Sequence, residues 1–359
     1  MNKKIIFCAG GTGGHIFPAI NLMKHFLQKG YNVVLVTDKR GNNFLNKNLK
    51  FKSYELKTGT LASKNLLGKI LSVIRIFISV LKSVSILKKE RADLIIGFGG
   101  YVSFPTSLAS KFFNIPLVIY EPNIVVGKAN KYLLPIAKKV FLGKDIKENF
   151  PEKHKTKLDV VGTIIEKNIL NYLNSEKKVK KENFSILVLG GSQGAEIFGK
   201  TVPTVINMIK EQGYKIQINQ QCMKNQKDSI VNYYKKKSIK NYVFEFEKNI
   251  LDLIFYSDLA ITRCGATTTA ELAHTATPFI AVPIPDSINN HQYLNAKYYE
   301  DRGYCWILDQ NNFNDENLFN LIIEIMKDKK KLESKHENMR KDYTDNVYNA
   351  IEAKIKEII

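Results

Sequence analysis

The stretch Ile5–His15 reads IIFCAGGTGGH, and a stretch of the same design, Ile186–Ala195, reads ILVLGGSQGA. Each joins an apolar run to a glycine-rich turn, a pattern typical of a buried parallel strand that leads into a helix. Glycine lets the backbone turn sharply and approach a ligand, and the N-terminus of the following helix favours a negative charge. Two such units predict two similar α/β domains that face one cleft and bind a ligand carrying phosphates.

Strand-like runs alternate with helix-like stretches along the 359 residues, a length that fits two α/β domains better than one core. We expect residues 1–162 to form the first domain and residues 163–339 the second, with a C-terminal helix at about 340–359 completing the first. The expected strands of the two parallel sheets are Ile5–Ala9, Val33–Thr37, Leu94–Phe98, Leu117–Tyr120, Val140–Leu142, Val160–Gly162, Ile186–Leu189, Ile216–Asn219, Val243–Phe246, Leu259–Thr262 and Phe279–Val282.

The formal net charge is +20, and lysine supplies almost all of the positive charge. This charge indicates either a compositional bias that coats the surface or attraction to an anionic partner, such as a membrane surface, a phosphorylated substrate or nucleic acid. The cysteines at 8, 222, 264 and 305 form no C-x-x-C pair, so neither a zinc site nor a disulfide framework is expected. A reducing cytoplasm fits this cysteine usage.

The segment Leu66–Leu87 reads LLGKILSVIRIFISVLKSVSIL. Three cations interrupt it before the roughly 20 uncharged residues that a membrane span needs, so we expect no transmembrane helix. A helical wheel gives one broad apolar face, while Ile76, Ile86 and Leu87 fall on the opposite side among serines and cations. We interpret these outer residues as the contact of a basic helix with an anionic membrane surface. An ordinary packing helix is the alternative.

His15 follows the first glycine loop on the first turn of the expected helix, at the mouth of the predicted cleft. Histidine titrates near neutral pH and can take a proton from an attacking hydroxyl, so His15 is our candidate general base. The alternative interpretation is a merely exposed histidine at a helix start.

Three polar stretches at predicted strand ends carry groups that suit a sugar nucleotide. TRCGATTTAE at 262–271 offers backbone N–H groups and hydroxyls to a phosphate, and Glu271 can accept both hydroxyls of a ribose, although the run could also simply cap a helix. YEPN at 120–123 and DSINNHQ at 286–292 offer amides that suit sugar hydroxyls. No D-x-D pair or Walker loop is present, so helix dipoles and hydroxyls would have to stabilise a departing diphosphate.

These motifs, in this order, resemble the MurG family, the membrane-associated N-acetylglucosaminyltransferases of peptidoglycan synthesis. The motifs that carry the resemblance are GGTGGHIFPAI, GGYVSFP, YEPN, LVLGGSQGA, TRCGATTTAE and HQYLNA. The resemblance implies a GT-B fold, in which two Rossmann-like domains face one cleft. It implies transfer of GlcNAc from UDP-GlcNAc to the 4-hydroxyl of MurNAc in lipid I, with inversion at the anomeric carbon, to give lipid II.

The resemblance also implies that the enzyme needs no metal and no cofactor. It places the protein at the cytoplasmic face of the bacterial inner membrane as a peripheral protein, with Leu66–Leu87 as the docking segment and cell-wall synthesis proteins as candidate partners.

Carried over by motif, the first domain holds the acceptor side of the site. His15 is the candidate base, or the residue nearest the acceptor hydroxyl, and Thr12, Gly13 and Gly14 border the donor sugar and the acceptor diphosphate. Asn123 holds a GlcNAc hydroxyl.

The second domain binds the donor in this resemblance. The assignments are Gln292 to the GlcNAc hydroxyls, Ser192 and the backbone from Ala266 through Thr267 and Thr268 to the diphosphate, Glu271 to the ribose, and the backbone near Phe246 and Glu247 to the uracil edge.

The sequence departs from the family pattern at three positions. Glu166 stands where the family commonly has an arginine that could pair with the donor diphosphate, so we expect Glu166 to point away or Lys167 to replace that arginine. Tyr120 stands where histidine is common, and Pro122 where glutamine is usual.

Three other functions compete with this one. An NAD-dependent oxidoreductase would use Asp38 at the end of a strand, but Ile16 breaks the G-x-G-x-x-G pattern. Another GT-B enzyme, a glycolipid synthase or a UDP-GlcNAc epimerase, is a nearer alternative. A non-catalytic basic binder would leave His15, Glu271 and Gln292 unexplained, and no arginine-rich helix indicates a nucleic-acid partner.

Overall fold

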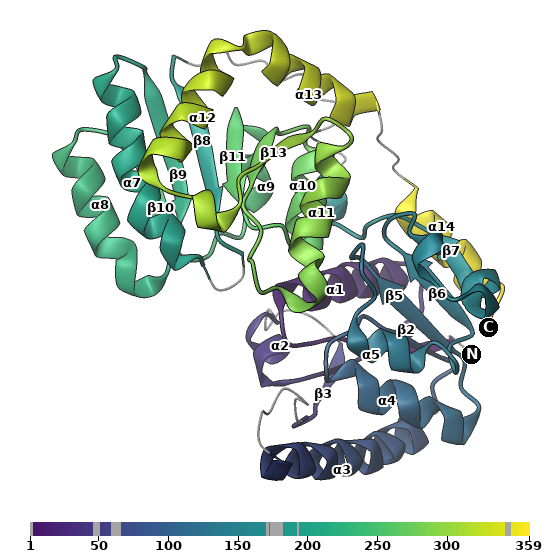
Figure 1. The fold of residues 1–359 in the computed structure, drawn as a ribbon. Helices are drawn as coiled ribbons and strands as arrows, with labels where there is room; N and C mark the ends of the chain where they lie inside the picture. Colours follow the sequence, from purple (N-terminus) through teal and green to yellow (C-terminus); the bar gives the residue numbers. More distant parts are fainter. Residues whose placement is uncertain are drawn as a thin grey trace. The chain divides into compact units, whose positions relative to one another are not determined.

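The computed structural model describes residues 3–45, 51–58, 66–169, 172, 182–191, 194–341 and 346–359. The chain divides into two compact units, of which unit 1 comprises Met1–Glu166 and Asn346–Ile359 and unit 2 comprises Lys167–Asp345. Each unit is built on a sheet whose paired strands all run parallel in the described part of the chain (Figure 1).

The sheet of unit 1 has the order β3-β2-β1-β4-β5-β6-β7. From β1 the order runs outward in one direction through β2 and in the other through β4, so the loops after β1 and β4 diverge at a topological switch point, where such folds bind ligands. Its strands are β1 Lys4–Cys8, β2 Asn32–Thr37, β3 Lys52–Glu55, β4 Leu94–Gly97, β5 Leu117–Glu121, β6 Lys139–Leu142 and β7 Leu158–Val160.

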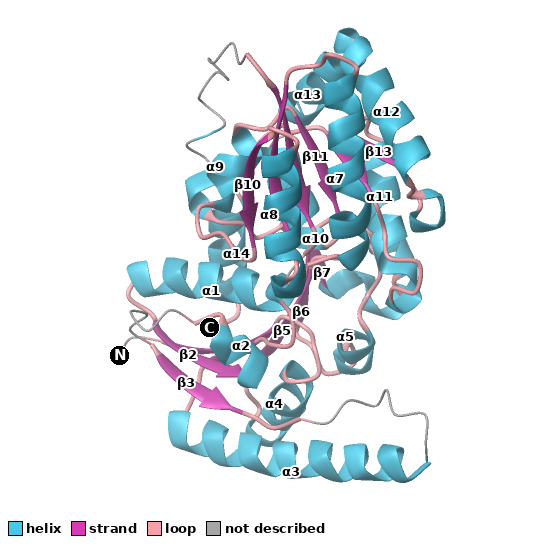
Figure 2. Cartoon of the chain, turned by 90° about the vertical axis from the view of Figure 1, so that its left-hand side faces the viewer, coloured by secondary structure: helices cyan, strands magenta, loops and turns pink. Residues whose placement is uncertain are grey.

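Helices cover both faces of this sheet (Figure 2). Because successive side chains of a strand point to opposite faces, Ile5 and Phe7 pack with α1 and α14, while Ile6 and Cys8 pack with α3, α4 and α5. The helices are α1 Gly13–Gln28, α2 Lys39–Asn43, α3 Leu66–Glu90, α4 Ser103–Ala109, α5 Lys128–Leu133 and α14 Val347–Lys356, with single 3₁₀ turns η1 Ser110–Phe113, η2 Lys147–Asn149 and η3 Glu152–Lys157.

The helix α14 returns the chain to unit 1 after all of unit 2. Val347, Ile351 and Ile355 lie in the same hydrophobic cluster as the buried residues of α1. His25 Nε2 of α1 lies 2.9 Å from a carboxylate oxygen of Glu352 on α14, and both side chains are buried. This helix is therefore an integral part of the core of unit 1.

The sheet of unit 2 has the order β10-β9-β8-β11-β12-β13, with a second switch point between β8 and β11. Its strands are β8 Phe184–Leu189, β9 Ile216–Gln221, β10 Lys240–Phe244, β11 Leu259–Thr262, β12 Phe279–Ala281 and β13 Cys305–Ile307. Its helices are α7 Glu196–Glu211, α8 Lys227–Lys236, α9 Ile250–Phe255, α10 Ala266–His274, α11 His291–Glu300, α12 Asp315–Lys327 and α13 Lys329–Lys341, with 3₁₀ turns η4 Lys167–Ile169, η5 Lys224–Gln226, η6 Ile288–Asn290 and η7 Gln310–Asn312.

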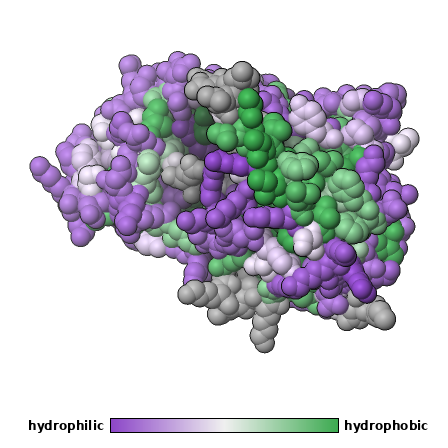
Figure 3. Space-filling view, turned by 90° about the horizontal axis from the view of Figure 1, so that it is seen from below, coloured by the Kyte–Doolittle hydropathy of each residue, from purple (hydrophilic) through white to green (hydrophobic). Residues whose placement is uncertain are grey.

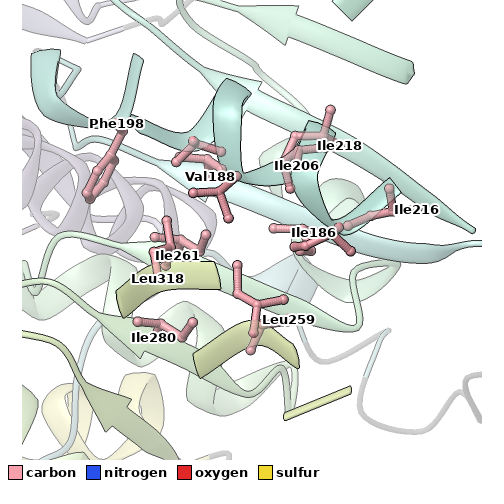
Figure 4. Packing of buried hydrophobic residues seen from close by; sticks show 14 of the residues in the cluster. Ile186, Val188, Phe198, Ile206, Ile216, Ile218, Leu259, Ile261, Ile280 and Leu318 are labelled. Carbon is pink, nitrogen blue, oxygen red and sulfur yellow. The ribbon is translucent and has the colours of Figure 1, made fainter. Parts of the chain in front are cut away.

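The core of unit 2 is a layer of mostly aliphatic side chains between the sheet and its helices. Ile186 of β8 and Ile261 of β11 pack with Phe198 and Ile206 of α7 and with Leu318 of α12 (Figure 4). A sheet covered on both faces has strands that read as continuous apolar runs, which is the pattern that the sequence shows.

The prediction of a doubly wound α/β fold in two copies is confirmed. Each predicted strand overlaps an observed one, although β7 begins two residues before the predicted Val160–Gly162 and β10 begins three residues before the predicted Val243–Phe246. The edge strands β3 and β13 were not predicted.

Candidate active site

The switch point of unit 1 holds the side chain of His15 on a bed of glycine backbone. An added Cβ at Gly99 would lie 3.2 Å from His15 Cε1, and one at Gly100 would lie 3.5 Å from His15 Cδ2. Both glycines have positive φ, at +84° and +78°, where other side chains are strained. The Gly99–Gly100 turn therefore fixes one side of the imidazole ring, which is half-buried on the first turn of α1.

Glu121 organises the next loop of unit 1. One carboxylate oxygen accepts hydrogen bonds from the backbone N–H and the side-chain amide of Asn123, at 3.1 and 3.0 Å. The other accepts from Gly127 N at 2.8 Å and from Asn130 Nδ2 at 2.9 Å. Asn130 Nδ2 also lies 3.6 Å from the Cβ position of Gly99, so the YEPN loop lies near the His15 bed. This role of Glu121 was not predicted from the sequence, although a carboxylate directly before a polar turn is a signal for it.

Asp38 directly follows β2 and holds the first glycine loop. Its carboxylate accepts hydrogen bonds from Gly11 N at 3.1 Å and from Gly41 N at 2.8 Å, and the second bond caps α2. In a dinucleotide-binding enzyme the acidic residue at this place binds a ribose. Here the carboxylate accepts hydrogen bonds from the protein's own backbone at Gly11 and Gly41, which argues against the NAD-dependent alternative.

Tyr120, which stands where the family often has histidine, lies in the core of unit 1. Its hydroxyl accepts a hydrogen bond from Ile164 N at 2.8 Å and lies 3.4 Å from Gly162 O. The tyrosine therefore supports the chain that leaves β7. Glu166 follows this segment and lies near Tyr348 of α14, whose pKa is raised by burial and by the Glu166 carboxylate.

The second glycine loop, after β8, is tightly folded. An added Cβ at Gly190 would lie 2.3 Å from Ala195 N, and Gly191 and Gly194 have φ of +81° and +73°. These positions require glycine because of the fold itself. Ser192, a predicted diphosphate ligand, lies outside the described residues.

The loop after β11 is open at its glycine. Gly265 is the N-cap of α10 with φ −67° and ψ 141°, and an added Cβ there would meet nothing within 4 Å. Neither backbone conformation nor packing therefore requires glycine at 265, which leaves space for the close approach of a ligand.

The N-terminus of α10 is suited to an anion. The first N–H groups of a helix have no partner inside the helix, and the helix dipole favours negative charge there. Thr267 is only 8% exposed, and its hydroxyl has no hydrogen-bond partner among the described residues. Thr269 instead donates to the Gly265 carbonyl oxygen at 3.0 Å, and the backbone of Ala266 and the half-buried Thr268 complete this end of the helix.

Helix α11 clamps the same loop. Gln292 Oε1 accepts hydrogen bonds from Cys264 N at 3.3 Å and from Ile284 N at 3.1 Å. The fully buried Asn295 donates from Nδ2 to Cys264 O at 3.1 Å. The carbonyl oxygen of the Gln292 side chain is thus occupied by these two backbone N–H groups. Its NH₂ group is the part that suits a sugar hydroxyl. The role of Asn295 was not predicted, although it lies in the HQYLNA motif.

The turn after β10 exposes an aromatic ring beside a fixed backbone. Phe246 is 62% exposed. The Glu247 carboxylate accepts hydrogen bonds from Asn249 N at 2.8 Å and from the Tyr242 hydroxyl at 2.7 Å, and these bonds lower the pKa of Glu247. Glu271, the predicted ribose ligand, is half-buried on the second turn of α10.

Helix α3 turns its apolar face outward, which corrects the prediction for Leu66–Leu87. Leu87 is 1% exposed and Ile86 is buried, so these residues belong to the core and not to an outer contact. Phe77, on the broad apolar face, is 61% exposed. The exposed apolar face of α3 consists of Ile70, Leu71, Val73, Ile74, Phe77, Ile78 and Leu81, and hydrophobic residues gather over it in the view from below (Figure 3).

The serines explain this inverted packing. Ser79 and Ser83 are buried, and each hydroxyl donates to the carbonyl four residues earlier at 2.8 Å, so the small side chains pack inward with their polar groups satisfied. Ser83 also lies 2.9 Å from the Thr106 hydroxyl of α4. Within the described residues Ile70–Glu90 is the one helix long and apolar enough, by length and composition, to cross a membrane. Its serine side is packed on unit 1.

Two doubly wound units, each with a glycine loop at its switch point, define the GT-B class of glycosyltransferase fold. The N-terminal domain model of glycosyltransferase family 28 matches residues 5–142, and the C-terminal domain model of that family matches residues 185–352. The chain belongs to glycosyltransferase family 28 and, within it, to the MurG family, as the sequence motifs indicated.

A relative from Pelagibacter ubique (strain HTCC1062) is 36% identical over 361 residues, which cover 100% of this chain and 99% of the relative. That relative is named UDP-N-acetylglucosamine--N-acetylmuramyl-(pentapeptide) pyrophosphoryl-undecaprenol N-acetylglucosamine transferase.

Solved structures share the fold. Acinetobacter baumannii MurG has a TM-score of 0.78 at 24% identity, over 99% of this chain and 100% of that chain. A putative UDP-N-acetylglucosamine 2-epimerase from Listeria monocytogenes has a TM-score of 0.68 at 15% identity, over 99% of this chain and 96% of that chain. At these identities the likeness concerns the fold alone.

Proposed function

We propose that the protein transfers GlcNAc from UDP-GlcNAc to the 4-hydroxyl of MurNAc in lipid I and so forms lipid II. The observation that carries the proposal is the full-length similarity to the Pelagibacter ubique relative, whose name describes this transfer. In addition, His15 lies at the switch point of unit 1, and a helix N-terminus with open space at Gly265 lies at that of unit 2. The residue roles below rest on the geometry of each unit.

Unit 2 binds the donor in this proposal. The diphosphate lies at the N-terminus of α10, against the open backbone at Gly265 and the buried hydroxyl of Thr267. As the bond from the sugar to UDP breaks, negative charge builds on the leaving phosphate, and the N–H groups and dipole of the helix stabilise it without a metal. Ser192 is assigned to the same diphosphate by the sequence motif.

The other donor groups surround that phosphate site. Glu271 accepts the ribose hydroxyls, and the Gln292 NH₂ group donates to a GlcNAc hydroxyl. The exposed Phe246 ring packs on the uracil, while the backbone of Phe246 and Glu247 reads the edge of the base.

Unit 1 binds the acceptor. His15 takes the proton of the 4-hydroxyl as that oxygen attacks the anomeric carbon from the side opposite UDP, which inverts the configuration. The Gly99–Gly100 bed keeps the ring in one orientation during this step. Thr12, Gly13 and Gly14 border the acceptor diphosphate at the N-terminus of α1, and the Glu121-held Asn123 contacts the donor sugar.

The exposed apolar face of α3 suits a lipid-linked acceptor. Arg75 and Lys82 are exposed on the same helix, and Phe112 in the neighbouring η1 is 70% exposed. An apolar face flanked by cations inserts shallowly into an anionic leaflet. We therefore place the protein at the cytoplasmic face of the inner membrane. Partner proteins of cell-wall synthesis stay a prediction from the family.

A UDP-GlcNAc epimerase is the second candidate, because the putative UDP-N-acetylglucosamine 2-epimerase from Listeria monocytogenes shares the fold. An epimerase acts on the nucleotide sugar without an acceptor, and it has no use for the apolar face of α3. The test measures GlcNAc transfer from labelled UDP-GlcNAc to a lipid I analogue in EDTA, with a control lacking acceptor. Acceptor-dependent product and UDP release are expected. Conversion of UDP-GlcNAc in the control would favour the epimerase, and binding without turnover would overturn the assigned acceptor.

A further inference from the structure

We infer that Gln221 is a positioning residue that sets the spacing between the diphosphate and uracil subsites of the donor. The inference rests on the proposed function, since those subsites belong to it. Gln221 Oε1 accepts a hydrogen bond from Gly190 N at 3.0 Å, and Gln221 Nε2 donates to Glu245 O at 3.1 Å. One side chain thus joins the glycine loop after β8 to the turn after β10.

The place of Gln221 in the sheet makes this link possible. It is the last residue of β9, which lies between β8 and β10. Adjacent strands are about 4.8 Å apart, so the two loops leave strands separated by about 10 Å. A planar amide has an acceptor at one end and a donor at the other, which matches an N–H on one side and a carbonyl on the other.

The neighbouring glutamine cannot replace it. Gln220 points to the opposite face of the sheet, where it is fully buried. It accepts a hydrogen bond from the Tyr234 hydroxyl at 2.5 Å and donates to Phe198 O at 3.3 Å. Gln220 therefore supports helix α7, and Gln221 alone of the pair reaches the two loops.

The two bonds hold the start of the loop that carries Ser192, which its motif assigns to the diphosphate, and the residue next to Phe246, which is proposed to pack on the uracil. Gly190 begins the glycine loop, and Glu245 directly precedes Phe246 and Glu247. Because both loops are held by one side chain, their spacing is set before the ligand arrives. Such preorganisation favours a ligand whose base and diphosphate are joined by a single pentose, and it reduces the ordering cost of binding.

The test compares Gln221→Met with Gln217→Met. Methionine keeps the length of the side chain and removes the amide. Gln217 lies four residues earlier on the same face of β9, at the opposite end from the glycine loop, so its variant is a matched control. Dissociation constants are measured for UDP, for uridine and for pyrophosphate by displacement of a fluorescent UDP analogue, and thermal unfolding checks the fold.

In Gln221→Met we expect the Kd of UDP to rise about tenfold, which corresponds to the loss of about one well-formed hydrogen-bond pair. Uridine and pyrophosphate should change by less than about twofold, because each subsite is intact and only their spacing is released. Gln217→Met should bind all three ligands like the wild type. Gln221→Glu, which keeps the acceptor and loses the donor, should weaken UDP binding with the same selectivity.

Wild-type affinity for UDP in both Gln221 variants would overturn the inference. An equal loss for uridine, pyrophosphate and UDP would also overturn it, because that pattern indicates general damage to unit 2. A wild-type protein that does not bind UDP would instead overturn the proposed function, and this inference with it.

Discussion

The Asp38 carboxylate accepts a hydrogen bond from Gly11 N at 3.1 Å, so a side chain at the end of β2 holds the glycine loop that follows β1. In unit 2 a side chain at the end of β9 holds the loop that follows β8 in the same topological place. In both units, therefore, a side chain at the end of the neighbouring strand accepts a hydrogen bond from the glycine loop, but the chemical group differs. A carboxylate can only accept, whereas the Gln221 amide also donates and so reaches a third strand.

Replacing Asp38 with alanine should lower both stability and transfer. The variant removes the cap of α2 and the bond to Gly11, and a lost cap costs about 1 kcal/mol. Asn314→Ala is the matched control, because Asn314 caps α12 in unit 2 and takes no part in the proposed site. Denaturant unfolding should show a similar loss in both variants. Full transfer activity in Asp38→Ala would show that the loop does not need this support.

His15→Ala should reduce kcat by roughly 10²-fold or more, the usual contribution of a general base. The affinity for UDP should not change, since the residues proposed to contact UDP itself lie in unit 2. His336→Ala on α13 controls for the loss of an imidazole elsewhere. Steady-state transfer and UDP titration measure the two effects, and an unchanged kcat would remove His15 from the chemistry.

Gly265→Ala should separate ligand binding from folding. The added methyl group meets nothing in the protein and the backbone φ of −67° accepts alanine, so stability should stay within about 0.5 kcal/mol of the wild type. The methyl group occupies the space proposed for the diphosphate, and the Kd of UDP should rise about tenfold or more. Gly190→Ala gives the contrast, because its Cβ would lie 2.3 Å from Ala195 N and should destabilise unit 2. Unchanged UDP affinity in Gly265→Ala would move the diphosphate elsewhere.

The exposed apolar face of α3 should bind anionic vesicles. Ile74→Glu with Phe77→Glu removes exposed apolar area and adds repulsion, so co-sedimentation with vesicles containing phosphatidylglycerol should fall at least fivefold without loss of stability. Leu87→Glu instead buries a charge in the core and should destabilise unit 1 by several kcal/mol, on the order of 3. Retained vesicle binding in the double variant would place the membrane contact on another surface.

Acid should lower the free energy of unfolding by protonating Glu90, the last residue of α3. Burial alone would raise the pKa of Glu90, but hydrogen bonds from Lys52, Tyr54 and Lys4 outweigh it and hold that pKa at about 2. The unfolded carboxyl group has a pKa of about 4.3, so its ionised form stabilises the fold above about pH 5. This contribution, about 2–3 kcal/mol, is lost as the pH falls from 5 toward 2.

The variant Glu90→Gln tests that linkage. Its free energy of unfolding should lie below that of the wild type at pH 7, and the difference should shrink at pH 3. Denaturant titrations at both pH values measure it. A difference that does not depend on pH would mean that Glu90 acts through its shape and not through its charge.

The sequence predicted the strands where a simple physical pattern marks them. Central parallel strands are buried on both faces and read as apolar runs, and the glycine turns that follow mark their ends. Strand β3 lacks this apolar pattern, because its residues Lys52–Glu55 lie at the sheet edge with largely exposed side chains. Strand β13 is apolar, but its run Cys305–Ile307 is only three residues long.

The orientation of α3 and the residues that support the site could not be predicted without the tertiary structure. A helical wheel identifies the apolar side of α3 but not the side that packs, and the inward serines satisfy their hydroxyls within the helix itself. Gln221 joins loops that follow two other strands, which no local pattern reveals, whereas Glu121 holds the loop that follows its own strand β5. Local motifs do predict His15 and the loop at Gly265 as site positions, because in each case a glycine turn and the start of a helix are adjacent in sequence.

Helix α14 also sets the order in which a newly made chain can finish folding. The ribosome delivers the first 166 residues of unit 1, then all of unit 2, and only then the helix whose Val347, Ile351 and Ile355 close the cluster around α1. Synthesis at about 5–20 residues per second leaves that apolar surface uncovered for roughly ten seconds or more. Unit 2 is one continuous segment and can complete itself meanwhile. Unit 1 therefore exposes the apolar residues that pack on α14 until that helix has been made.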